Sequence, residues 1–382
     1  MKRVFIILKE DIINYPPVLT ILNVLPKLGY KVIHIGVYSD IESKKKYEDE
    51  GIEFWPTLKY NGKAGLLTKF TSQLKYRKQV EKYLTNSNIT SNDRVWIMQA
   101  ETICLLNKVV EKYPCILHFY EYVEPSINWK YRLLNPLYNP SRTFAKAKKI
   151  VCCEYNRAHI TKGLFQLNEL PIVLPNKMVI DENVLKTIPK DIKPLYDEVL
   201  EKVKNKKVIL YQGIFLDKER RLEEFCEAIK KLSDEYVFIA MGRGSDMFDE
   251  LKKKYESDRI LFIPFVRPPY HLLVTKLASI GILSYFPRMG SVAYTINPIY
   301  CAPNKIFEYA KFGIPMISND IPALKYTYME YGCGECINYP ITTEAIVATI
   351  NKIFGNYEHY KSGALNYFNS VEPEKIIKEI VS

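Results

Sequence analysis

Short apolar runs alternate with longer amphipathic segments along most of this chain, and this alternation limits the fold more than any other feature. The runs lie at residues 3–8, 31–37, 95–98, 116–119, 150–153, 172–174, 208–213, 236–241, 280–284 and 314–318. Apolar runs of this length between helical segments are typical of βαβ units, in which helices cover a buried parallel sheet. The pattern predicts an α/β fold with two doubly wound, Rossmann-like domains.

The length of 382 residues is long for a single hydrophobic core and sufficient for two. A charged, Pro-containing stretch that ends near Pro194 has the composition of an interdomain connection. We therefore predict a first domain over 1–178, a second over 179–365 and a C-terminal segment over 366–382. The first strand is not followed by Gly-x-Gly-x-x-Gly, so a dinucleotide site of the dehydrogenase kind is unsupported.

Composition limits the environment of the protein. No uninterrupted apolar run reaches about 18 residues, so we expect no membrane-spanning helix. The apolar run at 4–8 ends too early for a signal peptide and lacks a small-residue cleavage site, which indicates a buried strand. The eight cysteines are scattered, and the single CxxC at 333–336 has no second ligand pair for zinc. Free thiols in a reducing cytoplasm, without a metal site, are therefore expected.

The formal net charge is +11, which favours an anionic partner. No zinc-finger spacing or aromatic-basic RNA motif is present, so nucleic acid is not predicted as the partner. Segment 59–84 carries seven Lys and Arg residues and one acid, interleaved with apolar side chains. Such a segment either lies against anionic lipid or forms the solvated basic face of an ordinary helix, and the pattern leaves both interpretations open.

The stretch 297–320 predicts a loop, a short helix and a buried strand, with Asn304 as the helix N-cap and Gly313 at its C-terminal end. A helix N-terminus suits a phosphate, and Lys305 adds a full positive charge there. Glu308 lies one turn further, where its oxygens can accept from two vicinal hydroxyls. The same spacing also fits an i,i+3 ion pair between Lys305 and Glu308. Judged by spacing alone, this structural interpretation is favoured over a ligand site.

The run Pro-Asn-Lys-Ile-Phe-Glu-Tyr at 303–309, followed by Gly-Ile-Pro-Met-Ile-Ser at 313–318, resembles the nucleotide-sugar signature of GT-B glycosyltransferases. It is most similar to the family 4-like branch that builds bacterial surface polysaccharides. The resemblance implies that Glu308 holds the donor ribose and that Asn304 and Lys305 hold the diphosphate. Many relatives carry a second Glu eight residues earlier, where this chain has Tyr300.

Two further positions match the resembled family in part. Gly213 follows directly on a strand, where the lack of a side chain lets a ligand approach the backbone. Arg220 matches the family's basic residue seven positions after this Gly, so the resemblance implies that it stabilises the departing diphosphate. The basic residue usual at the position after the Gly is replaced by Ile214, which leaves more of that charge to Arg220 or to Lys218.

Polar groups also follow the predicted strand at 116–119, at the sheet edge where α/β proteins place ligands. The family often has a His-Glu or His-Asp pair there, facing the acceptor; Tyr120-Glu121 occupies the matching position. Glu121 is therefore a candidate to hold or deprotonate an acceptor hydroxyl, although a carboxylate at a strand end also serves as a helix cap. His118 is expected on the packed side of the strand.

Together these features predict a hexosyltransferase that moves a sugar from a nucleotide-diphosphate sugar to a glycan or lipid-linked hydroxyl acceptor. The resemblance implies an acceptor-binding first domain, a nucleotide-sugar-binding second domain and a last helix that returns to the first. It also implies a retaining reaction that needs no metal or other cofactor. The predicted location is cytoplasmic, with 59–84 as a contact to the inner membrane face. The alternatives are a sugar-nucleotide epimerase of the same fold and a non-catalytic membrane-surface adaptor.

Overall fold

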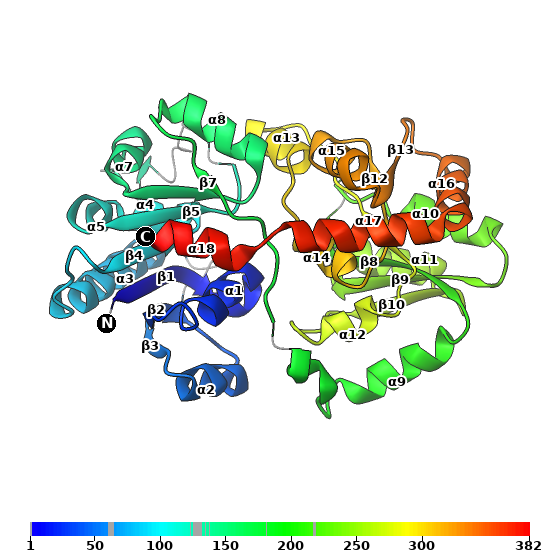
Figure 1. Ribbon diagram of the computed structural model, residues 1–382, viewed down its shortest axis with the longest axis horizontal. Coiled ribbons are helices and arrows are strands. Elements are labelled where there is room, and N and C mark those ends of the chain that lie inside the picture. Colours follow the sequence, from blue (N-terminus) through cyan, green and yellow to red (C-terminus); the bar gives the residue numbers. More distant parts are fainter. Residues whose placement is uncertain are drawn as a thin grey trace. The chain divides into compact units, whose positions relative to one another are not determined.

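The computed structural model describes residues 2–59, 65–122, 124, 132–133, 135–136, 138–180, 182–216 and 219–382. The chain divides into two compact units, and each is described by itself. Unit 1 comprises Met1–Val179 together with Glu372–Ser382, and unit 2 comprises Ile180–Val371. Both units contain a parallel sheet with helices on its two faces (Figure 1). The predicted α/β class with two doubly wound, Rossmann-like domains is confirmed.

Unit 1 is built on a seven-stranded sheet in the order β3-β2-β1-β4-β5-β6-β7. Its strands are β1 (Arg3–Asp11), β2 (Lys31–Val37), β3 (Glu53–Pro56), β4 (Arg94–Met98), β5 (Cys115–Phe119), β6 (Lys149–Cys152) and β7 (Ile172–Val173). Its helices are η1 (Ile12–Asn14), α1 (Pro16–Val24), α2 (Ile41–Asp49), α3 (Leu66–Asn86), α4 (Ala100–Leu105), α5 (Asn107–Lys112), α7 (Pro140–Lys146), α8 (Tyr155–Phe165) and α18 (Pro373–Val381).

Unit 2 is built on a six-stranded sheet in the order β10-β9-β8-β11-β12-β13. Its strands are β8 (Lys207–Ile214), β9 (Tyr236–Arg243), β10 (Ile260–Pro264), β11 (Ile280–Leu283), β12 (Met316–Asn319) and β13 (Gly334–Ile337). Its helices are η2 (Glu182–Lys186), α9 (Lys193–Lys202), α10 (Glu223–Lys231), α11 (Asp246–Tyr255), α12 (His271–Thr275), α13 (Val292–Ile299), α14 (Asn304–Lys311), α15 (Pro322–Tyr331), α16 (Thr343–Gly355) and α17 (Tyr357–Ser370).

Each sheet is buried on both faces, which explains why its strands are continuously apolar in the sequence. In β8, Val208 and Leu210 enter one hydrophobic cluster, whereas Ile209 and Tyr211 enter the cluster on the opposite face. β1 divides its side chains between the two clusters of unit 1 in the same way. The period-2 alternation of a strand therefore separates two apolar layers in each unit, not an apolar layer from solvent.

The strand orders contain one reversal each. The chain winds from β1 to β2 and β3 on one side, then returns to place β4 on the other side of β1. In unit 2 the same reversal places β11 on the other side of β8 from β9 and β10. Ligands of open α/β sheets bind outside the carboxyl ends of the strands at such a switch point. The fold thus marks the ends of β1 and β4, and of β8 and β11, as candidate sites.

Three sequence expectations differ from the structure for identifiable reasons. The run 17–28 predicts a helix over its whole length, but α1 ends at Val24, because Pro26 has no N–H for a helical hydrogen bond. The polar run from 285 to 302 predicts a long loop, but Ser291 caps the helix α13 within it. The helices predicted over 343–354 and 373–381 are present as α16 and α18, and the sequence did not predict α17 between them.

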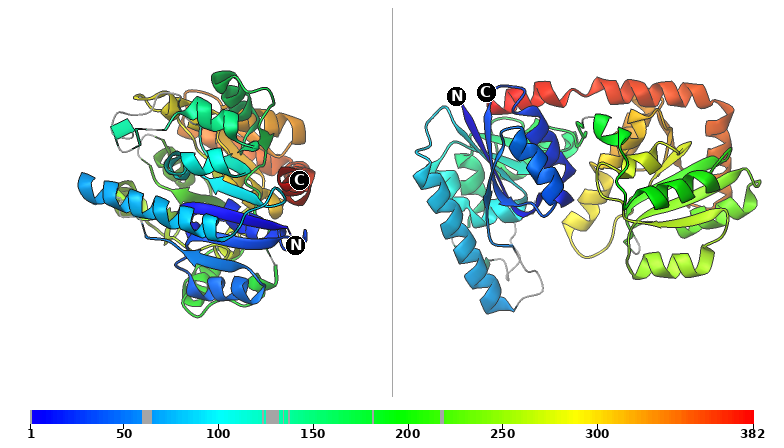
Figure 2. Two further views of the ribbon diagram at one scale, coloured as in Figure 1. Left: turned by 90° about the vertical axis from the view of Figure 1, so that its left-hand side faces the viewer. Right: turned by 90° about the horizontal axis from the view of Figure 1, so that it is seen from below.

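The two chain ends lie close together in unit 1 (Figure 2). α18 contributes Ile377 and Ile380 to the cluster that also contains Val4 and Ile6 of β1. The carbonyl of Ser382 accepts a 2.6 Å hydrogen bond from Arg94 at the start of β4. The C-terminal helix is therefore a structural part of unit 1, although the chain reaches it after completing unit 2.

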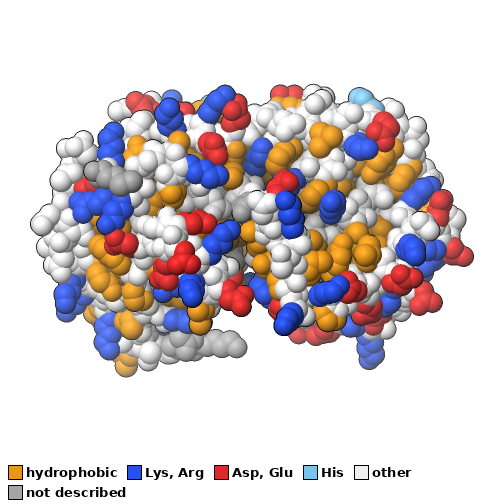
Figure 3. Space-filling model, turned by 60° about the horizontal axis from the view of Figure 1, so that its bottom comes forward, with side chains coloured by type: hydrophobic (Ala, Val, Ile, Leu, Met, Phe, Trp, Pro, Cys, Tyr) orange, Lys and Arg blue, Asp and Glu red, His pale blue; other side chains and the backbone are white. Residues whose placement is uncertain are grey.

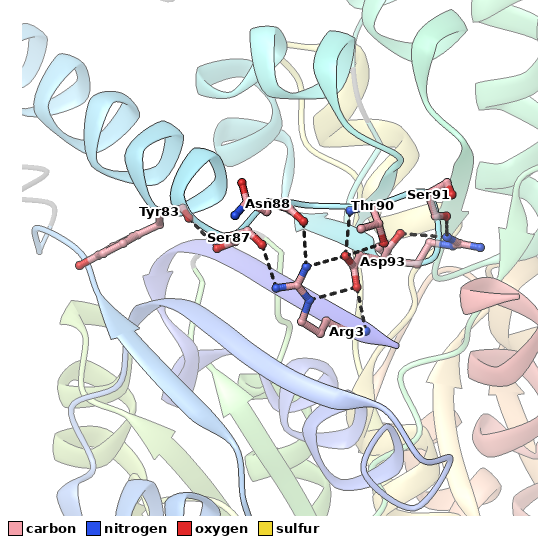
Figure 4. Close-up of polar contacts among 8 residues, drawn as sticks. Arg3, Tyr83, Ser87, Asn88, Thr90, Ser91 and Asp93 are labelled. Carbon is pink, nitrogen blue, oxygen red and sulfur yellow. Dashed lines mark hydrogen bonds and ion pairs between the residues drawn. The ribbon is translucent and has the colours of Figure 1, made fainter. Parts of the chain in front are cut away.

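An ion pair between the partly exposed Arg3 and the buried Asp93 joins the amino ends of β1 and β4 (Figure 4). Arg3 Nη2 lies 2.7 Å from Asp93 Oδ2, and Arg3 Nε donates to Oδ1 at 3.1 Å. The N–H and hydroxyl of Thr90 also donate to Asp93, at 2.9 and 3.0 Å. The pKa of Asp93 is lowered because these hydrogen bonds, led by that from Arg3, outweigh the opposing effect of burial.

We expect Asp93→Asn to destabilise the protein by about 2–3 kcal/mol at pH 7, since a hydrogen-bonded charge is lost and Arg3 is left unpaired. The folded-state pKa of Asp93 is lowered, so its contribution is complete above the unfolded pKa of about 3.9 and is lost as pH falls below it. The difference between wild type and variant in urea unfolding should therefore shrink below about pH 4. Asp234→Asn is the matched control, because the side chain of Asp234 is 94% exposed. Equal destabilisation at pH 7 and pH 3 would contradict this account.

Candidate functional site

Glycine lies near the carboxyl ends of both β8 and its neighbour β9. Gly213 has φ +141°, which other residues rarely adopt, and a Cβ there would lie 3.1 Å from Nζ of Lys305. On the neighbouring strand, a Cβ at Gly242 would lie 1.9 Å from the carbonyl oxygen of Gly213. Glycine at these two strand ends therefore lets β8 and β9 close together while Lys305 reaches over Gly213.

α14 supplies Lys305 and Glu308, as the sequence predicted, but Asn304 does not cap it. Pro303 holds the N-cap position, no side chain caps the helix, and Asn304 is its first residue. The extended conformation of Pro303 ends the preceding loop, so the helix starts one residue earlier than a cap at Asn304 would place it. The C-terminal end is as predicted: Gly313 has φ +65°, and its N–H donates to the carbonyl of Ala310 at 3.0 Å.

Lys305 is an almost buried cation whose neighbours are aromatic. Its side chain is 9% exposed, and Nζ lies 4.3 Å from the ring centre of Tyr211 and 5.2 Å from that of Tyr285. No carboxylate among the described residues forms an ion pair with Nζ. Burial lowers the pKa of Lys305 well below its usual range, and the nearby charge of Arg220 lowers it further, against the opposing effect of Glu308. The site is thus short of negative charge.

Arg220 places a second cation beside the first. Its guanidinium lies 4.2 Å from the ring centre of Tyr285, and Nη1 lies 2.9 Å from Oε1 of Glu219. The same carboxylate also pairs with Arg288, 3.1 Å away, so one acid is shared by two arginines. Nε of Arg220 is buried and has no hydrogen-bond partner among the described residues. Lys218, the other cation considered for this turn, lies outside them.

Glu308 lies in a buried polar cluster. Gln212 Nε2 donates to Oε2 at 2.5 Å, and Nε2 of His271 lies 3.1 Å from Oε1. Thr275 donates to Oε1 of Gln212 at 2.7 Å and so fixes the orientation of the amide. Burial alone would raise the pKa of Glu308, but His271, Gln212 and Lys305 together lower it. The carboxylate is therefore held ionised and in one orientation.

The sequence did not point to Gln212, His271 or Thr275. Gln212 directly precedes Gly213 at the end of a strand, and this was the signal that could have identified it. His271 and Thr275 are four residues apart on α12, a five-residue helix without a motif. Their role becomes visible only when the fold places α12 against α14.

The structure brings four predicted residues together in unit 2: Gly213, Arg220, Lys305 and Glu308. Asn304 begins the same helix as the last two. Glu121 lies in unit 1, exposed, just beyond the end of β5. His118 is fully buried, as expected, with Nε2 3.6 Å from Sγ of Cys153.

The basic segment forms most of α3, the longest helix among the described residues (Figure 2); 60–64 lie outside them. Tyr76, Val80 and Leu84 pack into unit 1, while Leu67 and Phe70 near the helix start are exposed. On the face drawn in Figure 3, Lys and Arg side chains are interspersed with acids. No described helix is both long enough and apolar enough to cross a bilayer. Contact with a membrane stays a prediction.

All eight cysteines are free. Within the described ranges, no cluster of three or more His, Cys, Asp and Glu side chains is arranged to hold a metal ion. The absence of a metal requirement stays a prediction.

Solved structures resemble this fold over its whole length. HepE of Anabaena in complex with UDP-glucose has a TM-score of 0.68 at 14% identity, covering 100% of this chain and 98% of that one. A glycosyltransferase from Rickettsia africae has a TM-score of 0.66 at 15% identity, covering 99% and 96%. MnaA of S. aureus with UDP has a TM-score of 0.63 at 14% identity, covering 100% and 95%.

No family model and no curated protein sequence matches the chain. Identities this low show a shared fold and no more, and the GT-B fold expected from the sequence is confirmed. The branch within that fold and the surface-polysaccharide pathway are not established by these likenesses.

We expect Gly213→Ala to destabilise unit 2 by about 2 kcal/mol, because its φ is unfavourable for alanine and its Cβ would press on Lys305. Thermal unfolding should show a fall in Tm of about 4–8 °C. Gly244→Ala is the control, since a Cβ there meets nothing within 4 Å. Equal Tm values for the two variants would show that β8 does not need glycine at 213.

Proposed function

We propose that the protein is a glycosyltransferase whose unit 2 binds a nucleotide-diphosphate sugar. The observation that carries the proposal is the pair of basic side chains, Lys305 and Arg220, beside the half-buried backbone of Gly213. They lie at the switch point of the sheet, where this fold class places ligands. Among the described residues one carboxylate, that of Glu219, pairs with Arg220, and it also pairs with Arg288. A bound diphosphate would supply the missing negative charge.

The diphosphate would lie between Lys305, Arg220 and the start of α14. Nε of Arg220 is a buried donor without a partner among the described residues, and a phosphate oxygen would satisfy it. The first N–H groups of α14, beginning at Asn304, offer further donors and the positive end of a helix dipole. Gly213 leaves room for the ammonium of Lys305, which would contact the ligand.

Glu308 would accept hydrogen bonds from the two ribose hydroxyls. A carboxylate has about four lone-pair sites, and Gln212 and His271 occupy one on each oxygen. Each oxygen keeps a site for one hydroxyl. The rigid support from Gln212 and His271 limits the entropy lost when the ligand binds. The solved structures of the same fold that contain UDP support a uridine nucleotide as the first donor to test.

In the transfer step, the bond between the anomeric carbon and the diphosphate oxygen breaks while the acceptor oxygen bonds to that carbon. Arg220 and Lys305 stabilise the negative charge that develops on the departing diphosphate. Glu121 orients the acceptor hydroxyl, a glycan or lipid-linked glycan in this proposal, and takes its proton. We propose that no metal is needed, because the two cations supply the charge stabilisation. We also propose retention of the anomeric configuration, which requires the acceptor oxygen to bond to the anomeric carbon on the face that the diphosphate leaves.

Incubation with labelled UDP-, GDP- and TDP-sugars separates the three functions considered. Transfer or hydrolysis of the sugar supports the glycosyltransferase. Interconversion of one sugar nucleotide into another supports the epimerase of the same fold. If no compound of the panel binds or reacts, the result supports the non-catalytic adaptor and contradicts the proposal.

Lys305→Met should weaken UDP binding by about 10- to 100-fold, the usual effect of losing a charge-assisted hydrogen bond. The ligand-free variant should be at least as stable as wild type, because a buried ammonium without an acidic partner is replaced by an apolar side chain. Thermal shift with UDP measures both quantities. The exposed Lys276→Met is the control in the same unit. Unchanged affinity in Lys305→Met would place the diphosphate elsewhere.

Binding of UDP should take up a proton at Lys305. Burial lowers its pKa in the free protein, and a bound diphosphate would raise it, so the affinity should fall as pH rises through the window between the two values. Calorimetry between pH 7.5 and 9.5 in buffers of different ionisation enthalpy measures the uptake. The phosphate groups are then fully ionised and do not contribute. Uptake that persists in Lys305→Met would assign the proton to another group.

A further inference from the structure

The switch point of unit 1, between β1 and β4, also carries polar side chains that pack against each other. The pairing of β1 with β2 shifts register between Leu8 and Asp11, so the strand is irregular at Lys9 and Glu10. Such irregularities redirect side chains at strand ends and occur often near active sites. Lys9 is nearly buried and pairs with Glu101 at 2.5 Å and Glu10 at 3.3 Å.

Gln99 directly follows β4 and has an unfavourable backbone conformation. Its φ of 72° and ψ of 139° lie outside the regions that side-chain-bearing residues normally populate. The chain has another positive-φ glutamine, Gln166, but that residue has φ 50° and ψ 46°, the ordinary left-handed conformation of a helix end. Strain of the kind seen at Gln99 persists only where surrounding contacts enforce it, and it is concentrated at functional sites.

Two hydrogen bonds hold Gln99 in this conformation. The N–H of Gln99 donates to the carbonyl of His118 on β5 at 2.8 Å, and Nε2 donates to the hydroxyl of Tyr15 at 3.0 Å. The other side-chain atom, Oε1, is buried and has no hydrogen-bond partner among the described residues. Buried polar atoms are rarely left unpaired, so this oxygen is free to accept a hydrogen bond that no described residue donates.

The groups around Gln99 are mostly acceptors of hydrogen bonds. Burial raises the pKa of Tyr15 to about 12, with further contributions from Glu10, Glu101 and Glu121. Three carboxylates therefore lie near the tyrosine that holds the Gln99 amide, and Lys9 is the cation that pairs with two of them. This surrounding disfavours an anionic ligand and suits hydroxyl groups, which can donate to Oε1 and to the carboxylates.

We propose that Gln99 binds the acceptor, with its side-chain carbonyl taking a hydrogen bond from a hydroxyl of an uncharged sugar. The inference rests on the proposed transferase function and extends it, since it assigns the acceptor contact to the β1–β4 switch point as well as to Glu121. The strained backbone of Gln99 is then retained because it directs the amide to the ligand. Without a ligand the strain destabilises unit 1.

The test uses Gln99→Gly, which removes both the amide and the strain, because glycine tolerates this conformation. The probes are methyl glucoside, which is neutral, and methyl glucuronide, which is anionic, both followed by saturation-transfer NMR. We expect the variant to bind methyl glucoside at least tenfold more weakly than wild type, with a Tm equal to wild type or about 2–4 °C higher. UDP binding should be unchanged. Gln166→Gly, in the same unit, should leave both sugar and UDP binding unchanged.

Unchanged methyl glucoside binding in Gln99→Gly would overturn the inference, as would wild-type protein that binds the glucuronide as well as the glucoside or binds neither. If Gln99→Gly does not fold, Gln99→Asn decides, since asparagine keeps the amide and the strained backbone while its shorter side chain stops the carbonyl short of the ligand. Wild-type affinity in that variant overturns the inference, and lost affinity at unchanged Tm supports it. Failure of the proposed function is seen separately, as a lack of UDP binding by the wild-type protein.

Discussion

The structure of unit 2 depends on how it accommodates two neighbouring basic side chains, Lys305 and Arg220, that are both largely buried. A buried ammonium without an acidic partner is costly, and the group responds by lowering its pKa. Lys305 lies in that situation, with the rings of Tyr211 and Tyr285 in place of a carboxylate. Arg220 lies against Tyr285 as well, so one ring contacts both basic side chains. Aromatic rings attract cations without neutralising them. An anionic ligand beside Lys305 would therefore raise its lowered pKa again and restore its positive charge.

The two basic side chains can lie together because both follow the carboxyl ends of strands in one sheet. The hydrogen bonds and apolar layers of β8 to β13 fix where each strand ends, and the switch point leaves the ends of β8 and β11 uncovered by a crossover. Gly281 of β11 shows how closely α14 is fitted: a Cβ there would lie 2.3 Å from the ring of Tyr309. Tyr309 in turn donates to the carbonyl of Leu210 at 3.1 Å. Lys305, one turn before Tyr309, and Glu308 are positioned by that same anchored helix.

The sequence predicted the fold class because a doubly wound sheet depends on a regular property, the alternation of buried strands and amphipathic helices. The resemblance to a family also grouped Gly213, Arg220, Lys305 and Glu308 in one site, since the last two belong to one local motif and the first two to another. It missed His271 and Gln212, because their contacts with Glu308 join residues 37 and 96 positions apart, and sequence spacing carries no signal for such pairs. The misplaced cap at Asn304 had another origin: good capping chemistry was overridden by Pro303 beside it.

The two proposed sites differ in the side chains that one topology carries. Both sheets reverse their strand order after three strands, so each has a switch point at an equivalent place. The strand ends of unit 2 carry glycine and are faced by Lys305 and Arg220, which suit a polyanion. Those of unit 1 carry Gln99 and Glu10, which accept hydrogen bonds and suit hydroxyl groups. The proposed transfer needs both kinds of site, one for a charged leaving group and one for an uncharged nucleophile. Under this proposal the two switch points are alike in strand order, and the few side chains at the ends of β1, β4, β8 and β11 decide what each one binds.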